Sequence, residues 1–142
     1  MSVPKATARG PGRRDRHGRR GGRVAIVVRN GAVDVSKVDG DELLDRDVEL
    51  TVTGLREGRY RLRHHRLDEQ HSNLNRTWAE IAGGRAWPTE ADWQTLHDAD
   101  HLAELEPPSV VATDAGVLRL EYALPMPALS LVELEQVSPT DD

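Results

Sequence analysis

Two histidines, His97 and His101, have the spacing in this sequence that most resembles a catalytic motif. Histidines four positions apart on a helix can hold a zinc ion, and a carboxylate between them can act as a base. Asp98 stands where the zinc metalloprotease motif has Glu. Both histidines lie outside the apolar face that Trp93 and Leu96 predict for this helix, and no third ligand is apparent. We therefore predict a solvated helix edge with no metal and no cofactor, and we keep a metal-dependent hydrolase using His97 and His101 as an alternative.

Other titratable pairs give weaker signals. His64 and His65 are adjacent in a predicted strand, so their side chains point to opposite faces of the sheet. We expect one to be packed and the other to be in water. The acidic pair Asp41-Glu42 falls in a predicted loop, and the sequence contains neither a glycine-rich phosphate loop nor a Gly-x-Ser-x-Gly turn. No catalytic residue is predicted.

The fourth group is a dense polar corner that contains Asp68, His71, Ser72 and Asn73. Ser72 or Asn73 is well placed to cap a following helix through a side-chain oxygen. Capping and turn formation explain about half of the polarity of this corner.

The elements around the corner are predicted from periodicity. Residues 59–67 alternate at the two-residue period of a half-buried strand, and Leu74, Trp78 and Ile81 then follow at helical spacing. Upstream, residues 24–28 and 48–53 read as strands. Downstream, Thr89 begins a second helix whose apolar face is Trp93, Leu96, Ala99 and Ala103, and residues 110–112, 118–122 and 129–134 read as strands. This order predicts a mainly β protein, an antiparallel β-sandwich with a two-helix insertion, rather than a parallel α/β sheet.

Composition limits the classes of function. The chain has 142 residues, no Cys and no Phe, which allows one domain with a modest aliphatic core and excludes disulfides and thiolate chemistry. No apolar run approaches the roughly 20 residues of a membrane span. The N-terminus lacks the apolar segment of a secretory signal. We therefore expect a cytoplasmic protein with no membrane partner.

Charge divides the chain into two parts. Residues 1–23 hold eight of its 19 basic side chains and one of its 24 acidic ones, and they are rich in Gly. Such a segment cannot bury enough apolar area to offset the entropy of ordering, so we predict a disordered tail over 1–23, a domain over 24–136 and a second disordered tail over 137–142. The first tail has no aromatic residue for base stacking and the rest of the chain is acidic. We therefore expect no nucleic-acid partner.

A family resemblance adds to this interpretation of the corner. The segments that carry it are Tyr60-Arg61-Leu62, Asp68-Glu69-x-His71-Ser72-Asn73, Trp78, Trp87-Pro88-Thr89, Leu105-Glu106-Pro107-Pro108, Leu124-Pro125-Met126-Pro127 and Ser130-Leu131-Val132-Glu133-Leu134. In this order and spacing they resemble the C-terminal accessory region of glycoside hydrolase family 39, the β-xylosidase and α-L-iduronidase family. The resemblance covers roughly residues 24–134. One departure is Arg29, which stands where the family's first strand typically ends in an aromatic residue.

The resemblance implies a β-sandwich without its catalytic partner. Family members cleave glycosidic bonds with retention by means of two glutamates, which lie on a (β/α)₈ barrel. A barrel of that kind needs about 250 residues, so this chain has no counterpart of either glutamate. The resemblance also implies that the Asp68, His71, Ser72 and Asn73 corner approaches the substrate side of the enzyme.

We therefore predict a non-catalytic C-terminal domain, a fragment or separately encoded piece of a β-xylosidase-like enzyme. Its expected partners are a (β/α)₈ barrel, in cis or in trans, and carbohydrate. One face of the sandwich should then expose a contiguous apolar patch. A free-standing carbohydrate-binding module is the second alternative, and it would need exposed aromatic side chains.

Overall fold

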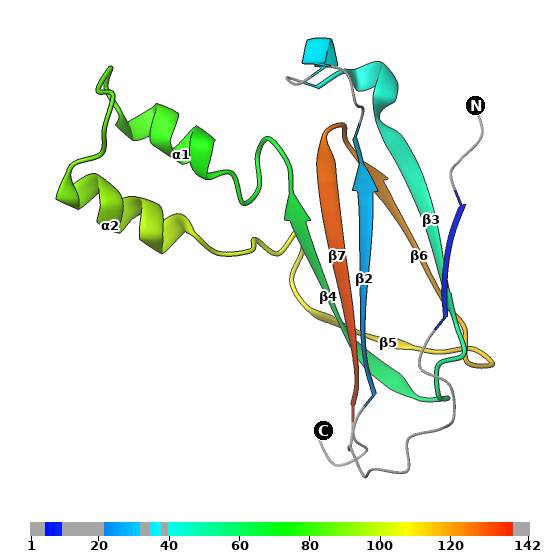
Figure 1. Cartoon of the computed structure of the whole chain (residues 1–142). Helices are drawn as coiled ribbons and strands as arrows, with labels where there is room; N and C mark the ends of the chain where they lie inside the picture. The colour runs from blue at the N-terminus through cyan, green and yellow to red at the C-terminus, as the bar shows by residue number, and fades with distance from the viewer. Residues whose placement is uncertain (1–4, 10–21, 32–34, 38–39, 138–142) are drawn as a thin grey trace.

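The computed structural model describes residues 5–9, 22–31, 35–37 and 40–137, which form two packed β-sheets and a helical hairpin (Figure 1). One sheet has the strand order β1-β3-β6 and the other has the order β2-β7-β4-β5. The strands are β1 (Lys5–Arg9), β2 (Arg23–Asn30), β3 (Arg46–Thr53), β4 (Arg59–Leu67), β5 (Ser109–Ala112), β6 (Leu118–Leu124) and β7 (Ala128–Gln136). The helices are α1 (Leu74–Ile81) and α2 (Glu90–Ala99). The mainly β fold with a two-helix insertion is confirmed.

Alternation along the strands builds the core between the sheets. In β3 the buried positions are Val48, Leu50 and Val52, and in β7 they include Val132 and Leu134. Each such side chain contributes about 1.5–3 kcal/mol by leaving water, so this cluster is the main source of stability. The other core residues are Leu55, Tyr60, Leu62, Leu118, Leu124 and Ala128.

The N-terminal segment differs from the prediction at one place. Residues 5–9, expected within a disordered tail, form β1, which pairs with β3 in parallel. Two contributions explain the strand: it hydrogen-bonds along an edge of β3, and Ala6 packs against the core. The remaining pairs of the two sheets are antiparallel. The rest of the predicted tails, residues 1–4, 10–21 and 138–142, lies outside the described residues.

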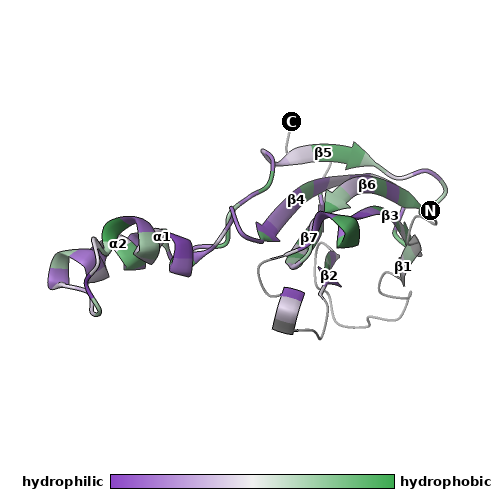
Figure 2. Ribbon diagram, turned by 90° about the horizontal axis from the view of Figure 1, so that it is seen from above, coloured by the Kyte–Doolittle hydropathy of each residue, from purple (hydrophilic) through white to green (hydrophobic). Residues whose placement is uncertain are grey.

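The two helices form a hairpin that projects from one end of the sandwich (Figures 1 and 2). Asn73 caps α1 by accepting a hydrogen bond from the Arg76 amide, and Thr89 and Asp92 form a capping box at the start of α2. Both caps follow the sequence prediction. Gly83 and Gly84 have positive φ angles and end α1 as expected.

The predicted apolar face of the second helix is only partly correct. Leu96 is buried, but Trp93 is 56% exposed and Ala103 lies beyond the end of the helix. A hairpin with only two helices has one inner face, so it cannot cover every apolar side chain that helical spacing brings together. In the described part of the chain, neither helix has the length and apolar character needed to cross a membrane.

Candidate functional site

The polar corner between β4 and α1 is built around the carboxylate of Asp68. Its Oδ1 accepts hydrogen bonds from the backbone amides of Gln70 and His71, each at 2.8 Å, and lies 2.8 Å from His71 Nδ1. The other oxygen, Oδ2, is 3.6 Å from a guanidinium nitrogen of Arg66. The side chain of Asp68 is only 8% exposed. This arrangement fixes the turn at residues 68–71.

The hydrogen bonds also set the charge of Asp68. Burial raises the pKa of this carboxyl, but the hydrogen bonds from the His71 side chain and the two amides outweigh it and hold the pKa below its usual value of 3.8. Asp68 is therefore ionised at neutral pH. It acts as an acceptor, not as a general acid.

Ser72 connects the two ends of the helical hairpin. Its Oγ donates to the Arg66 carbonyl at 2.8 Å and accepts from the Ala103 amide at 2.8 Å. The Arg66 amide also donates to the Ala103 carbonyl at 3.0 Å, and the Leu105 amide donates to the His64 carbonyl at 2.7 Å. Ser72 adopts a positive φ of 53°, which places its hydroxyl between the two segments. We call this set of contacts the hairpin clasp.

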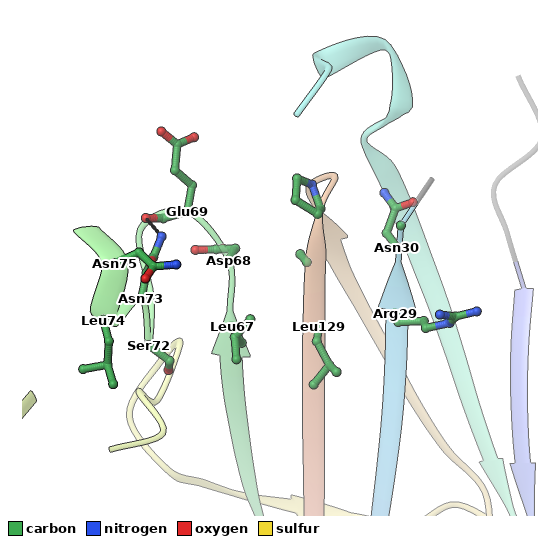
Figure 3. A pocket seen from close by; sticks show the side chains of 13 residues that line it. Arg29, Asn30, Leu67, Asp68, Glu69, Ser72, Asn73, Leu74, Asn75 and Leu129 are labelled. Carbon is green, nitrogen blue, oxygen red and sulfur yellow. Dashed lines mark hydrogen bonds between the residues drawn. The ribbon is translucent and has the colours of Figure 1, made fainter. Parts of the chain in front are cut away.

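Two hollows flank the corner and share Ser72 and Asn73. The larger has a volume of about 710 Å³ and lies at the ends of β2, β4 and β7 beside the start of α1 (Figure 3). Leu67, Leu74 and Leu129 line it together with polar residues such as Asn30, Glu69 and Asn75. Asp68, Ser72 and Asn73 line this hollow, whereas His71, Ser72 and Asn73 line a smaller one of about 470 Å³.

The four predicted corner residues are therefore brought together, in a mainly structural arrangement. Asp68 and His71 contact each other, Ser72 completes the clasp, and Asn73 caps α1. Carboxylate, amide and hydroxyl groups of this kind can hydrogen-bond a neutral hydroxylated ligand. That these residues lie near a substrate stays a prediction.

A buried polar cluster inside the sandwich was missed by the sequence analysis. Arg66, 3% exposed, donates from Nε to Ser130 Oγ at 3.1 Å and from a terminal nitrogen to the Ala123 carbonyl at 2.8 Å. His64, 4% exposed, lies 3.0 Å from the same Ser130 Oγ and packs edge-on against Tyr122. The signal was present, because the alternation that buries Tyr60 and His64 also points Arg66 inward.

Charge and burial perturb two groups of this cluster. Burial, aided by the charge of Arg66, lowers the pKa of His64 below its usual value of 6.5. Burial also raises the pKa of Tyr122 above 10, although the charge of Arg66 opposes this. Ser130 is fully buried, so its contact with His64 lies inside the four-stranded sheet and cannot act on a dissolved substrate. The links from this cluster to β6 of the other sheet are the Arg66 hydrogen bond to the Ala123 carbonyl and the ring contact of His64 with Tyr122.

The histidine pairs behave differently from each other. His64 and His65 point to opposite faces as predicted, but His65 is not open to water: its side chain is 12% exposed and lies 3.2 Å from a Glu133 carboxylate oxygen. For the zinc alternative, α2 ends at Ala99, so His97 and His101 do not lie four apart on one helix. Within the described residues no three His, Cys, Asp or Glu side chains are grouped to hold a metal.

The outward face of the four-stranded sheet has a charged half and a half that is mainly apolar, which we call the apolar half. In the register of β2, β7 and β4, Arg23, Glu135 and Arg61 form one cross-strand row. Toward the helical hairpin the rows become Val27–Leu131–His65 and Arg29–Leu129–Leu67. Val27 is 61% exposed and Leu67 is 47% exposed.

Leu74 of α1, 37% exposed, extends the apolar half because it lines the larger hollow with Leu67 and Leu129. We define the apolar patch as Val27, Leu67, Leu74, Leu129 and Leu131. Figure 3 shows Leu67 and Leu129 side by side on β4 and β7. Exposed apolar side chains therefore gather at the helical end of this face, with Arg29 and His65 in the same rows, and their being covered by a barrel stays a prediction.

Solved structures share this arrangement of sheets and helices. A family 39 glycoside hydrolase from Xanthomonas axonopodis pv. citri gives a TM-score of 0.65 over 81% of the chain at 18% identity. A monomeric β-xylosidase from Caulobacter crescentus gives a TM-score of 0.63 over 82% of the chain at 21% identity. The fold is that of an accessory domain of family 39 glycoside hydrolases. No family model and no curated protein matches the sequence.

A third solved structure has a higher sequence identity to this chain. A bacterial orthologue of human α-L-iduronidase is 30% identical over 68% of this chain, with a TM-score of 0.53. The chain spans only 18% of that protein, and it spans 24% of the Xanthomonas and Caulobacter chains. The likeness to family 39 enzymes is therefore a likeness to one part of them.

Proposed function

We propose that this chain is the non-catalytic C-terminal domain of a β-xylosidase-like retaining glycoside hydrolase and that it acts together with a (β/α)₈ catalytic barrel. One observation carries the proposal: the matches cover 68–82% of this chain but only 18–24% of the similar proteins.

The apolar patch supplies the surface on which the barrel would dock. Exposed apolar side chains that form a contiguous group usually mark an interaction site, and here they gather at the helical end of one sheet. The charged half of the same face, with the Arg23–Glu133 and Arg23–Glu135 ion pairs, stays in water. This asymmetry supports a partner that covers only the apolar half.

The polar corner would then lie at the border between the two domains. The larger hollow joins the apolar patch to Asp68, Ser72 and Asn73, so a barrel seated on the patch approaches these residues. Asn73 and the neighbouring Asn75 and Glu69 give its rim groups that can both donate and accept hydrogen bonds. We propose that this rim contacts the catalytic domain or the sugar at its active-site side.

A chimera tests the proposal. In the bacterial α-L-iduronidase orthologue, residues 22–137 of this chain would replace the matching segment. We expect the chimera to be soluble and to retain hydrolytic activity, whereas the enzyme with the segment deleted should lose solubility or activity. A chimera that is no more stable or active than the deletion variant would contradict the proposal.

One observation favours a second candidate function, carbohydrate binding. A free-standing carbohydrate-binding module needs exposed aromatic side chains, and Trp87 is 82% exposed. The metal-dependent hydrolase is not pursued, because the helix on which it depended ends before His101.

A further inference from the structure

The helical hairpin presents two tryptophans to water at the end farthest from the sandwich. Trp87, 82% exposed, lies in the loop between α1 and α2, and Trp93, 56% exposed, lies in the first turns of α2. Figures 1 and 2 show this loop projecting away from both sheets. The other aromatic side chains of the chain, Tyr60, Trp78 and Tyr122, are buried or half-buried.

The loop that carries Trp87 is tied to α2 by the carboxylate of Asp92. Its Oδ2 accepts hydrogen bonds from Arg85 at 2.7 Å, from the Thr89 amide at 2.8 Å and from Thr89 Oγ1 at 2.8 Å. Arg85 also donates to the Ile81 carbonyl at 3.1 Å, which ties the loop back to α1. Trp87 lies in the sequence between Arg85 and Thr89, which both donate hydrogen bonds to Asp92. These bonds hold the loop on both sides of Trp87 without a ligand.

A fixed loop lowers the entropy that binding would otherwise cost. Hydrogen bonds from Thr89 and Arg85 also lower the pKa of Asp92, which keeps the carboxylate ionised and the loop closed at neutral pH. Trp87 and Trp93 are neither members of the core cluster nor among the partly buried side chains packed against it, so the core does not account for these two large rings. A loop held in this way is suited to binding a ligand through exposed aromatic rings.

The surroundings of the two rings favour a hydroxylated ligand over a protein. Protein hot spots are usually ringed by further contacts that exclude water. Of the neighbouring exposed side chains, Arg85, Glu90 and Gln94 are polar, and Ala86 and Ala91 are too small to form such a ring. An indole face packs well on the apolar face of a pyranose ring, and the surrounding polar groups can hydrogen-bond its hydroxyls.

We propose that Trp87 and Trp93 form a stacking site for the pyranose units of a polysaccharide chain. The proposal rests on the proposed function only for the class of ligand, a β-linked chain such as xylan, since the similar proteins include a β-xylosidase. The site is separate from the apolar patch, which lies on the sheet and at the start of α1, at the opposite end of the hairpin.

Titration of the full chain with xylo-oligosaccharides tests this site, with intrinsic tryptophan fluorescence and calorimetry as readouts. We expect saturable binding, a loss of at least fivefold in affinity for Trp87→Ala and for Trp93→Ala, and a smaller loss for Trp87→Tyr, which keeps an aromatic face. Leu43→Ala is the matched control, because Leu43 is 84% exposed and lies outside the hairpin; its affinity should be unchanged.

Absence of binding at millimolar oligosaccharide, or binding that survives both alanine substitutions, would overturn the proposal. So would tryptophan variants that bind sugar normally but destabilise the chimera, since the rings would then contact the catalytic domain. An active chimera that binds no oligosaccharide through the hairpin would reject this site and leave the proposed function standing. An inactive chimera that binds oligosaccharide normally would reject the proposed function and leave the tryptophan site standing.

Discussion

At the scale of single residues, the interior depends on a buried arginine that the sequence pattern could have revealed. The alternation in β4 places Tyr60, Leu62 and His64 inward, and the same period reaches Arg66. What the sequence could not show is its set of partners, because Ser130 and the Ala123 carbonyl are more than 50 positions away. A buried charge is tolerated only when such partners satisfy it.

His64 gives a prediction for the pH dependence of stability. Its pKa is lowered in the folded protein by burial and by Arg66, so below pH 6.5 the unfolded chain binds a proton that the folded chain resists. The free energy of unfolding should therefore be highest above pH 6.5 and fall as the pH is lowered from there toward 5. Urea unfolding at several pH values measures this.

His64→Gln is the comparison for that prediction. Glutamine keeps a polar group facing Ser130 but cannot titrate, so the loss of stability between pH 6.5 and 5 should become shallower. The lowered pKa of Asp68 acts at lower pH, below its usual value of 3.8, and does not enter this range. Equal slopes in the two proteins would show that His64 is not the group responsible.

Asp68 gives a second prediction at this scale. In Asp68→Asn the side-chain shape is kept, but the charge that faces Arg66 and receives three hydrogen bonds is lost. We expect the free energy of unfolding to fall by about 1–3 kcal/mol. Glu69→Gln, at the neighbouring exposed position, should change it by less than about 0.5 kcal/mol. Equal effects of the two substitutions in chemical denaturation would contradict this role.

At the scale of elements, the order of strands and helices followed from the sequence, but their pairing did not. The helix caps at Asn73 and Thr89 are local signals and were predicted correctly. β1 was not predicted, since its pairing with β3 depends on an edge that exists only once the sheet has formed. The candidate site shows the same division: the polar corner was evident in the sequence, whereas the clasp that joins Ser72 to Ala103 spans 31 positions.

The hairpin clasp can be tested through Ser72. Ser72→Ala removes the hydroxyl that bonds the Arg66 carbonyl and the Ala103 amide, which should cost about 1–3 kcal/mol. Ser72→Gly removes the same hydroxyl but relieves the positive φ, so it should be the less destabilised of the two. Amide hydrogen exchange should increase at Ala103 in both variants. Unchanged exchange there would mean that Ser72 does not hold the hairpin.

At the scale of the whole molecule, the chain resembles the accessory domain of family 39 glycoside hydrolases. A core joins two sheets, a hairpin projects from one end, and an apolar patch lies beside its base. Assayed alone against aryl xylosides, the purified chain should release no product. Measurable turnover that persists through successive purification steps would contradict a purely non-catalytic role.

The measurement that tests the account most directly is the thermal stability and activity of the chimera with Val27→Asp or Val110→Asp. The two valines are 61% and 53% exposed on the outward side of the same sheet, but only Val27 belongs to the apolar patch. If the catalytic domain docks on the patch, Val27→Asp should lower the melting temperature and the activity of the chimera, and Val110→Asp should leave both unchanged. Equal effects of the two substitutions, or no effect of either, would contradict docking through this face.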